Sequence, residues 1–205
     1  EYTLPEHGDC YICLIFTQIG ETAWADDGHE VAFAQFKLPV DDSRRVVEYD
    51  NTLFSVSESE KYLKIIGNGF TYLFNKPHGC FEQLTIANKK LLNSPIDFNI
   101  WRALIRNDCF QNEKWENLHY ERMVNSVRRV ACKKTDSGVE IATITRIGAV
   151  SRICPITVNT LWTINTLGII TLEADVTVDE DVEYLPRFGL RTSVDKSLNT
   201  VEYFG

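Results

Sequence analysis

The sequence of 205 residues is acidic, with a formal net charge of −8 and a pI near 5.1. This mean charge repels phosphate backbones and anionic lipid, so we expect neither nucleic acid nor a membrane surface as a partner. The apolar stretches are strand-sized and much shorter than the roughly 20 residues of a spanning helix. With 44% hydrophobic and 24% charged residues, the composition is typical of a folded globular chain.

Two runs rich in β-branched and aromatic residues come first, at residues 11–17 and 30–38. A polar segment joins them, which predicts a pair of antiparallel sandwich strands. Residues 39–45 are too polar to bury anything and indicate a connection between modules. We therefore predict one domain over residues 1–44 and a second over residues 45–205. The chain lacks an initiator Met and ends after a strand-like run, so we expect both ends to be cut from a longer polypeptide.

Short strands at even spacing dominate the second module, and Gly67-Asn68-Gly69 and Pro77-His78-Gly79 supply the residues that tight reversals need. Residues 99–123 interrupt this rhythm and predict one short helix around residues 113–122. Regular strands then resume. The expected strands are residues 52–57, 62–66, 70–74, 81–86, 123–133, 138–147, 156–165, 168–178, 188–193 and 201–204. This pattern predicts an all-β fold, an antiparallel β-sandwich.

Six cysteines are scattered along the chain, most of them inside apolar, strand-like runs. They are Cys10, Cys13, Cys80, Cys109, Cys132 and Cys154. A reduced cysteine in such a run behaves as a small buried hydrophobe, so we expect free thiols and a cytoplasmic location. Cys10 and Cys13 have the spacing of a redox or zinc pair, but side chains three apart on a strand point to opposite faces. We favour packing for both.

Signatures of independent catalysis are missing from the sequence. The four histidines, His7, His29, His78 and His119, are isolated from one another, and no nucleophile elbow, phosphate loop or dinucleotide fingerprint occurs. The acidic run of residues 175–183 reads as a solvated loop. We therefore predict no catalytic residue and no metal ligand set within this chain.

The four tryptophans are candidates for core packing or for stacking on sugar rings. Packing is the expected role of Trp24 and Trp101, and of Trp162, which lies between Leu161 and Ile164 in a predicted strand. For Trp115, in the irregular segment, the sequence leaves both roles open.

Two segments together resemble the C-terminal region of the large bacterial β-galactosidases of the lactose-operon type, in glycoside hydrolase family 2. Residues 21–38, with Trp24-Ala25 and Gly28-His29-Glu30, resemble the closing strands of the immunoglobulin-like domain that follows the catalytic barrel. Residues 70–108 and residues 185–205 are similar to parts of the last domain. The resemblance implies a partial immunoglobulin-like segment followed by the first half of a supersandwich related to the galactose mutarotase fold.

The resemblance also implies a function for the longer enzyme: hydrolysis of terminal β-D-galactosides such as lactose. In the family, two glutamates on a TIM barrel run the reaction, with magnesium and sodium close by. That barrel would lie upstream of Glu1, so none of its functional residues corresponds to a residue of this sequence. The resemblance implies that this chain is a non-catalytic scaffold, active-site rim and subunit interface, whose partners are the catalytic barrel, the sugar and further copies in a homo-oligomer.

The chain departs from the family at one motif. The family reads Arg-Ala-Pro-x-Asp-Asn-Asp followed by one residue and glycine, whereas residues 102–110 here lack the proline, one aspartate and the glycine. In the family the loop after this motif reaches toward the mouth of the active site. Arg102, Asn107 and Asp108, with Trp115, are therefore our candidates for substrate contact. A buried ion pair between Arg102 and Asp108 that fixes the irregular segment is the alternative.

Two further functions remain open from the sequence. A carbohydrate-binding module without catalysis would need two or three aromatic residues on one exposed face, for which Trp115 and Tyr120 are the candidates. A mutarotase-like epimerase would need a histidine and a carboxylate facing each other across a pocket. The sequence locates no such pair.

Overall fold

The computed structural model describes residues 3, 8, 10–40, 53–150, 155–180, 182 and 185–201. The chain forms two compact units, residues 1–48 and residues 49–205, and each is described by itself. The domain boundary that the sequence predicts between residues 44 and 45 lies outside the described residues. The fold is all-β with antiparallel sheets, as the sequence predicts.

A single antiparallel hairpin makes up the described strands of the first unit, with β1 at Tyr11–Thr17 and β2 at Glu30–Lys37. The register places Leu14 opposite Ala34 and Ile15 opposite Phe33, so both faces of the hairpin carry apolar pairs. Of these, Leu14, Ile15 and Phe33 are exposed within the described residues. A two-stranded ribbon of this kind is at best marginally stable in water, so these faces require a cover.

The second unit contains two larger sheets. The five-stranded sheet runs in chain order: β3 (Ser55–Glu58), β4 (Tyr62–Gly67), β5 (Phe70–Asn75), β6 (Cys80–Ile86) and β7 (Lys89–Lys90). The four-stranded sheet has the order β12-β11-β10-β9, with β9 at Met123–Thr135, β10 at Gly138–Ala149, β11 at Ile156–Asn165 and β12 at Ile170–Val178. A short pair joins β8 (Asp97–Asn99) to β13 (Gly189–Arg191), and the helical segments are η2 (Arg106–Phe110), α1 (Asn112–Asn117) and η3 (Tyr120–Arg122).

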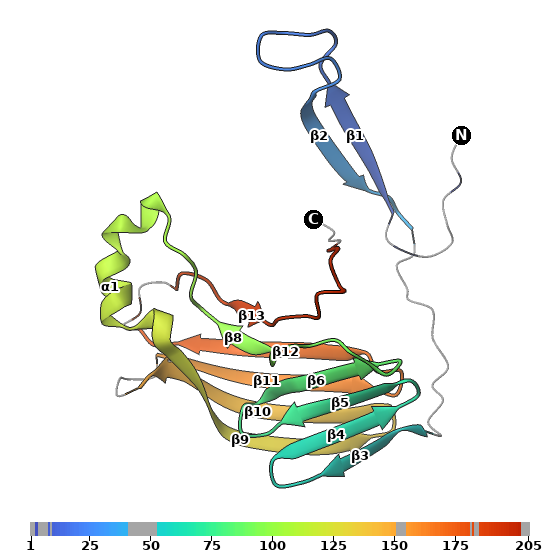
Figure 1. Cartoon of the computed structure of the whole chain (residues 1–205), viewed down its shortest axis with the longest axis vertical. Coiled ribbons are helices and arrows are strands. Elements are labelled where there is room, and N and C mark those ends of the chain that lie inside the picture. Colours follow the sequence, from blue (N-terminus) through green and yellow to red (C-terminus); the bar gives the residue numbers. More distant parts are fainter. Residues whose placement is uncertain are drawn as a thin grey trace. The chain divides into compact units, whose positions relative to one another are not determined.

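The two larger sheets pack face to face and enclose the main core (Figure 1). Alternation along β10 shows why: Val139 and Ile141 are buried, whereas Ala142 and Ile144 face outward. The buried residues of this core are Leu63, Ile65, Phe70, Tyr72, Phe74, Phe81, Val139, Ile141, Trp162 and Ile164. Trp162 meets the edges of Phe74 and Phe81 at ring-centroid distances of 6.2 and 5.3 Å. The sandwich and the core position of Trp162 are thus confirmed.

Glycine fixes the reversal between β9 and β10. Gly138 has φ +153°, and a Cβ added there would lie 2.0 Å from the carbonyl oxygen of Ile164. Gly69, in the turn between β4 and β5, also has a positive φ of +76° but faces open space. Both positions need the conformational freedom of glycine, and Gly138 also needs its lack of a side chain.

The predicted strands and helix differ from the observed ones mainly at their ends. The predicted helix of residues 113–122 divides into α1 and η3, separated by His119, whose φ is +56°. The strand predicted at residues 188–193 shortens to β13, because only Gly189–Arg191 find a partner strand, β8. Most of the strand predicted at residues 201–204 lies outside the described residues.

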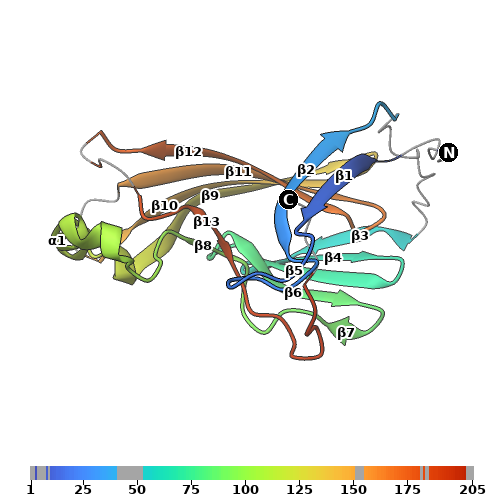
Figure 2. The same cartoon turned by 90° about the horizontal axis from the view of Figure 1, so that it is seen from above.

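A second core lies on the four-stranded sheet. The helical segments lie at one end of this sheet in both views (Figure 2), and the second core is formed near them. It is formed by Ile100, Trp115, Tyr120, Ile147, Ile156 and Val158. Ile147 comes from β10, and Ile156 and Val158 come from β11. The irregular segment is therefore anchored by its aromatic residues to the inner face of the sheet.

Candidate functional site

An ion pair between Arg102 and Asp108 organises the loop that the sequence singled out. Nη1 of Arg102 donates to Oδ2 of Asp108 at 2.6 Å, and Nη2 donates to Oδ1 at 2.9 Å. The backbone N–H of Ile105 donates to the same Oδ2 at 2.8 Å. The carboxylate is buried, with its side chain 8% exposed. These bonds, first of all those from Arg102, hold the pKa of Asp108 below its usual value.

The other contacts of Arg102 tie this loop to a distant part of the chain. Nε donates to the carbonyl oxygen of Pro186 at 3.0 Å, and Nη1 also donates to that of Ala103 at 3.2 Å. The guanidinium lies over the ring of Trp115, 5.6 Å from its centroid. Arg102 therefore holds the loop, the segment at Pro186 and the buried tryptophan in one arrangement.

Trp115 belongs to the core of this unit. It is 2% exposed, and its ring meets that of Trp101 edge to face at 6.5 Å. Tyr120 is equally buried, and burial raises the pKa of its hydroxyl. As they lie here, neither aromatic residue offers an open face to a sugar ring. The exposed aromatic face that a carbohydrate-binding module would need is therefore not formed by this pair.

We call residues 103–110 the clamp loop, because the bonds from Arg102 hold them in place. Its apolar members point into solvent to an unusual degree: Leu104, Ile105 and Phe110 are 40%, 58% and 87% exposed. Asn107 is also exposed. The structure thus brings Arg102, Asp108 and Trp115 together at the base of the loop and leaves Asn107 at its surface. Direct sugar contact by these four residues stays a prediction.

Asp97, a half-buried carboxyl in β8, is a polar residue that the sequence analysis did not single out. Asp97 accepts hydrogen bonds from the backbone N–H of Phe98 at 3.0 Å and from the side-chain amide of Asn125. Burial raises the pKa of Asp97 and, together with nearby carboxylates, that of the Cys80 thiol, which reaches about 12. The only sign in the sequence was that a charged residue, Asp97, stands between Ile96 and Phe98 in an otherwise apolar run.

The described ranges contain no group of three or more His, Cys, Asp or Glu side chains that could hold a metal ion. No helix in the described part is long and apolar enough to cross a membrane.

The described cysteines are free thiols; they are Cys10, Cys13, Cys80, Cys109 and Cys132. Two residues that the sequence analysis named, Cys154 and His7, lie outside the described residues.

Comparison with known proteins gives a consistent result. Residues 66–205 match the protein family described as "Beta galactosidase small chain". A β-galactosidase of Actinobacillus pleuropneumoniae is 30% identical over 179 residues, which are 86% of this chain and 18% of that protein. A β-galactosidase of Lactobacillus delbrueckii subsp. bulgaricus is 28% identical over 89% of this chain and 18% of that protein. One of Priestia megaterium is 32% identical over 52% of this chain and 11% of that protein.

The chain spans less than a fifth of the length of these curated relatives, from 11% to 18%. The similarity therefore concerns one region of much longer polypeptides.

Proposed function

Since this chain belongs to the β-galactosidase small chain family, we propose that it is the C-terminal, non-catalytic part of a β-galactosidase. The longer enzyme would hydrolyse terminal β-D-galactosides such as lactose. The observation that carries the proposal is the family match over residues 66–205, together with relatives several times longer that bear that enzyme's name. The free thiols of the described cysteines support a cytoplasmic location.

The chemistry of the buried carboxyl groups supports a non-catalytic role. Retaining glycosidases need two carboxyl groups about 5–5.5 Å apart across the sugar, one of them with a raised pKa. Asp108 is held ionised by Arg102, which makes it a poor general acid. Asp97 has a raised pKa, but its Oδ1 accepts hydrogen bonds from the side chain of Asn125 and from the backbone N–H of Phe98. We therefore place the acid and the nucleophile on a barrel upstream of Glu1.

The clamp loop is the part of this chain that we assign to the active-site rim. Its exposed apolar side chains, Ile105 and Phe110 above all, suit a contact with another protein surface. Because Arg102 fixes the base of the loop, this surface is pre-organised before the contact forms. Phe110 stands where the family has glycine, so the rim here is bulkier and its sugar preference is expected to differ. We assign the remainder of the unit to scaffolding and to the interface of a homo-oligomer.

The hairpin β1–β2 fits the same proposal. Its apolar pairs on both faces, such as Leu14 with Ala34 and Ile15 with Phe33, need a cover on each side. We propose that the missing strands of an immunoglobulin-like sandwich, encoded upstream, provide it.

Complementation in trans tests the proposal. A β-galactosidase polypeptide that lacks the region matching residues 53–205 should be inactive toward a chromogenic β-galactoside. Addition of the purified 205-residue chain should restore hydrolysis. A chain with Arg102→Ala, checked for folding by circular dichroism, should restore less. Full activity of the shortened polypeptide, without any addition, would show that this region is dispensable and would refute the proposal.

A further inference from the structure

We propose that Asn68 is a site of spontaneous deamidation, at which the backbone nitrogen of Gly69 converts the asparagine into aspartate and isoaspartate. This inference does not rest on the proposed enzymatic role, because it concerns a chemical change within the hairpin of β4 and β5. Three features support it: the residue pair in the turn, the absence of hydrogen bonds on the reacting groups, and the packing that the turn holds in place.

The turn between β4 and β5 consists of Asn68 and Gly69 alone, since Gly67 pairs with Phe70. No other asparagine of the sequence precedes a glycine. Gly69 has φ +76°, and a Cβ added to it would meet no atom within 4 Å. Without a side chain, Gly69 leaves its nitrogen open and rotates easily. The chain itself holds the side-chain carbonyl carbon of Asn68 next to this nitrogen, which favours attack within the molecule.

The reacting groups of Asn68 and Gly69 form no hydrogen bond within the described residues. Both residues are exposed. The carbonyl oxygen of Gly69 accepts a hydrogen bond from the N–H of Ala87 at 2.8 Å, but the N–H of Gly69 has no acceptor among the described residues. The turn is thus anchored through its carbonyl group, and the nitrogen is left to react.

Other asparagines of the second unit are held by hydrogen bonds. The side-chain amide of Asn75 donates to Oε2 of Glu82 at 2.6 Å, and the N–H of Lys76 donates to the carbonyl oxygen of Lys61 at 2.9 Å. Oδ1 of Asn165 accepts two backbone N–H groups, and the N–H that follows this residue is also donated. These bonds must open before either side chain can react, so the structure protects both residues.

The reaction needs only water as a partner. The nitrogen of Gly69 attacks Cγ of Asn68, and the new N–Cγ bond closes a succinimide ring. The Cγ–Nδ2 bond breaks, and ammonia leaves with the proton that the nitrogen of Gly69 gives up. Water then opens the ring. Cleavage of the new N–Cγ bond gives aspartate, whereas cleavage of the original peptide bond gives isoaspartate, in which the main chain runs through Cβ and Cγ.

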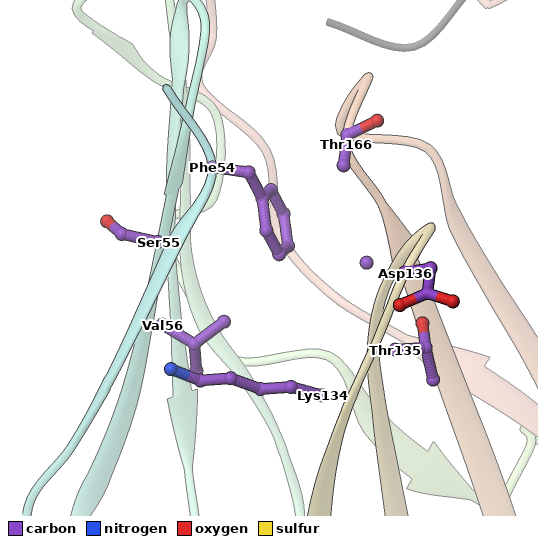
Figure 3. Close-up of a pocket in the computed structure, with 8 residues that line it drawn as sticks. Phe54, Ser55, Val56, Lys134, Thr135, Asp136 and Thr166 are labelled. Atoms are coloured by element: carbon purple, nitrogen blue, oxygen red, sulfur yellow. The ribbon is translucent and has the colours of Figure 1, made fainter. Parts of the chain in front are cut away.

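The packing of Phe70 depends on this turn. A Cβ added at Gly67 or at Gly168 would collide with the ring of Phe70, so the ring packs directly on the main chain at both glycines. Phe70 is 6% exposed, and its ring centroid lies 4.7 Å from that of Tyr72 and 6.5 Å from that of Phe54. Phe54 in turn lines a pocket of about 220 Å³ whose walls come from both sheets (Figure 3). The turn therefore supports one end of the main core.

Isoaspartate would disturb this end of the core. It adds one carbon atom to the main chain of a turn whose length fixes the pairing of Gly67 with Phe70. The ring of Phe70 would then shift from its place between the two glycines, and the folded chain would lose stability. Aspartate adds a negative charge at an exposed site and leaves the main chain unchanged, so it should have little effect.

Prolonged incubation of the folded 205-residue chain at mildly alkaline pH, followed by peptide mass spectrometry, tests the reaction. Conversion of amide to acid should be about tenfold faster at Asn68 than at Asn75 or Asn165, because those residues must first break hydrogen bonds. Isoaspartate, detected with an isoaspartyl methyltransferase, should be among the products. Equal rates at the three residues, reaction of Asn68 only in urea, or aspartate without isoaspartate would overturn the proposal.

Two variants separate the chemistry from its effect on folding. Asn68→Gln closes the ring much less readily and should keep its amide, and Asn68→Asp carries the charge of the product on an unaltered main chain. The incubated original chain should unfold at a lower urea concentration than the fresh one. Incubated Asn68→Gln and fresh Asn68→Asp should unfold close to the fresh original chain. Equal loss of stability in incubated Asn68→Gln, or none in a chain rich in isoaspartate, would contradict the dependence of Phe70 on the turn.

Discussion

Replacing Trp115 by alanine should lower the free energy of unfolding by about 3–5 kcal/mol, the usual range for a large aromatic residue removed from a core. Trp115 is 2% exposed and belongs to the same buried cluster as Ile147, Ile156 and Val158. A buried aromatic side chain removes roughly 150–250 Å² from water, and about 25 cal/mol per Å² gives about 4–6 kcal/mol before the share that alanine retains is subtracted. The edge-to-face contact with Trp101 contributes about 0.5–1.5 kcal/mol of additional stability.

Urea unfolding of the 205-residue chain, followed by far-ultraviolet circular dichroism, measures this loss. Phe110→Ala is the matched control, because it removes an aromatic side chain from the same segment at a site that is 87% exposed. The control should change the free energy of unfolding by no more than about 0.5 kcal/mol. Equal effects of the two substitutions would refute the assignment of Trp115 to the core and return it to the candidates for sugar stacking.

Four further predictions concern polar side chains and thiols. The pKa of Asp108 is lowered from its ordinary value of 3.8, so its contribution to stability is full above that pH and is lost as the pH falls through the lower folded-state pKa. Asp108→Asn should therefore flatten the acid limb of stability against pH in urea titrations. In the longer enzyme, Asp108→Ala should change the melting temperature and leave KM unchanged, whereas a raised KM would indicate sugar contact. Thr143 and Thr160 share a buried hydroxyl hydrogen bond of 2.6 Å. Valine at one of the two positions should lower the free energy of unfolding by about 1–3 kcal/mol, because the other hydroxyl is left unpaired. In a double-mutant cycle, valine at both positions should lower it by less than the sum of the two single changes. Burial raises the pKa of the Cys80 thiol to about 12, whereas Cys109 is exposed. Iodoacetamide at about pH 8 should therefore modify Cys109 in the folded chain and Cys80 only after unfolding, as read by peptide mass spectrometry.

Alternation along the chain was enough to predict the sandwich and the burial of Trp162. Burial alternates along β10 and β11, and most of the buried positions are apolar, so this pattern indicates which face of the sheet meets the core. The possible pairing of Arg102 with Asp108 was also visible in the sequence, because their chemical types match and they lie six residues apart.

What the sequence did not predict depends on contacts between distant segments. β8 pairs with β13 about 90 residues further along the chain, and Leu92 bridges to Val194. Trp115 remained ambiguous because a helix of six residues has too few turns to show which face is apolar. The sequence also did not predict the pocket lined by Phe54, Val56 and Thr135, because its walls come from segments about 80 residues apart.

Incubation of the purified 205-residue chain with a chromogenic β-galactoside is the most direct measurement of its proposed supporting role. We expect no hydrolysis above the rate in buffer, because the acid and the nucleophile are placed on a region that this chain does not contain. Turnover that elutes with the folded chain in gel filtration, and that disappears when the chain is unfolded, would contradict this account.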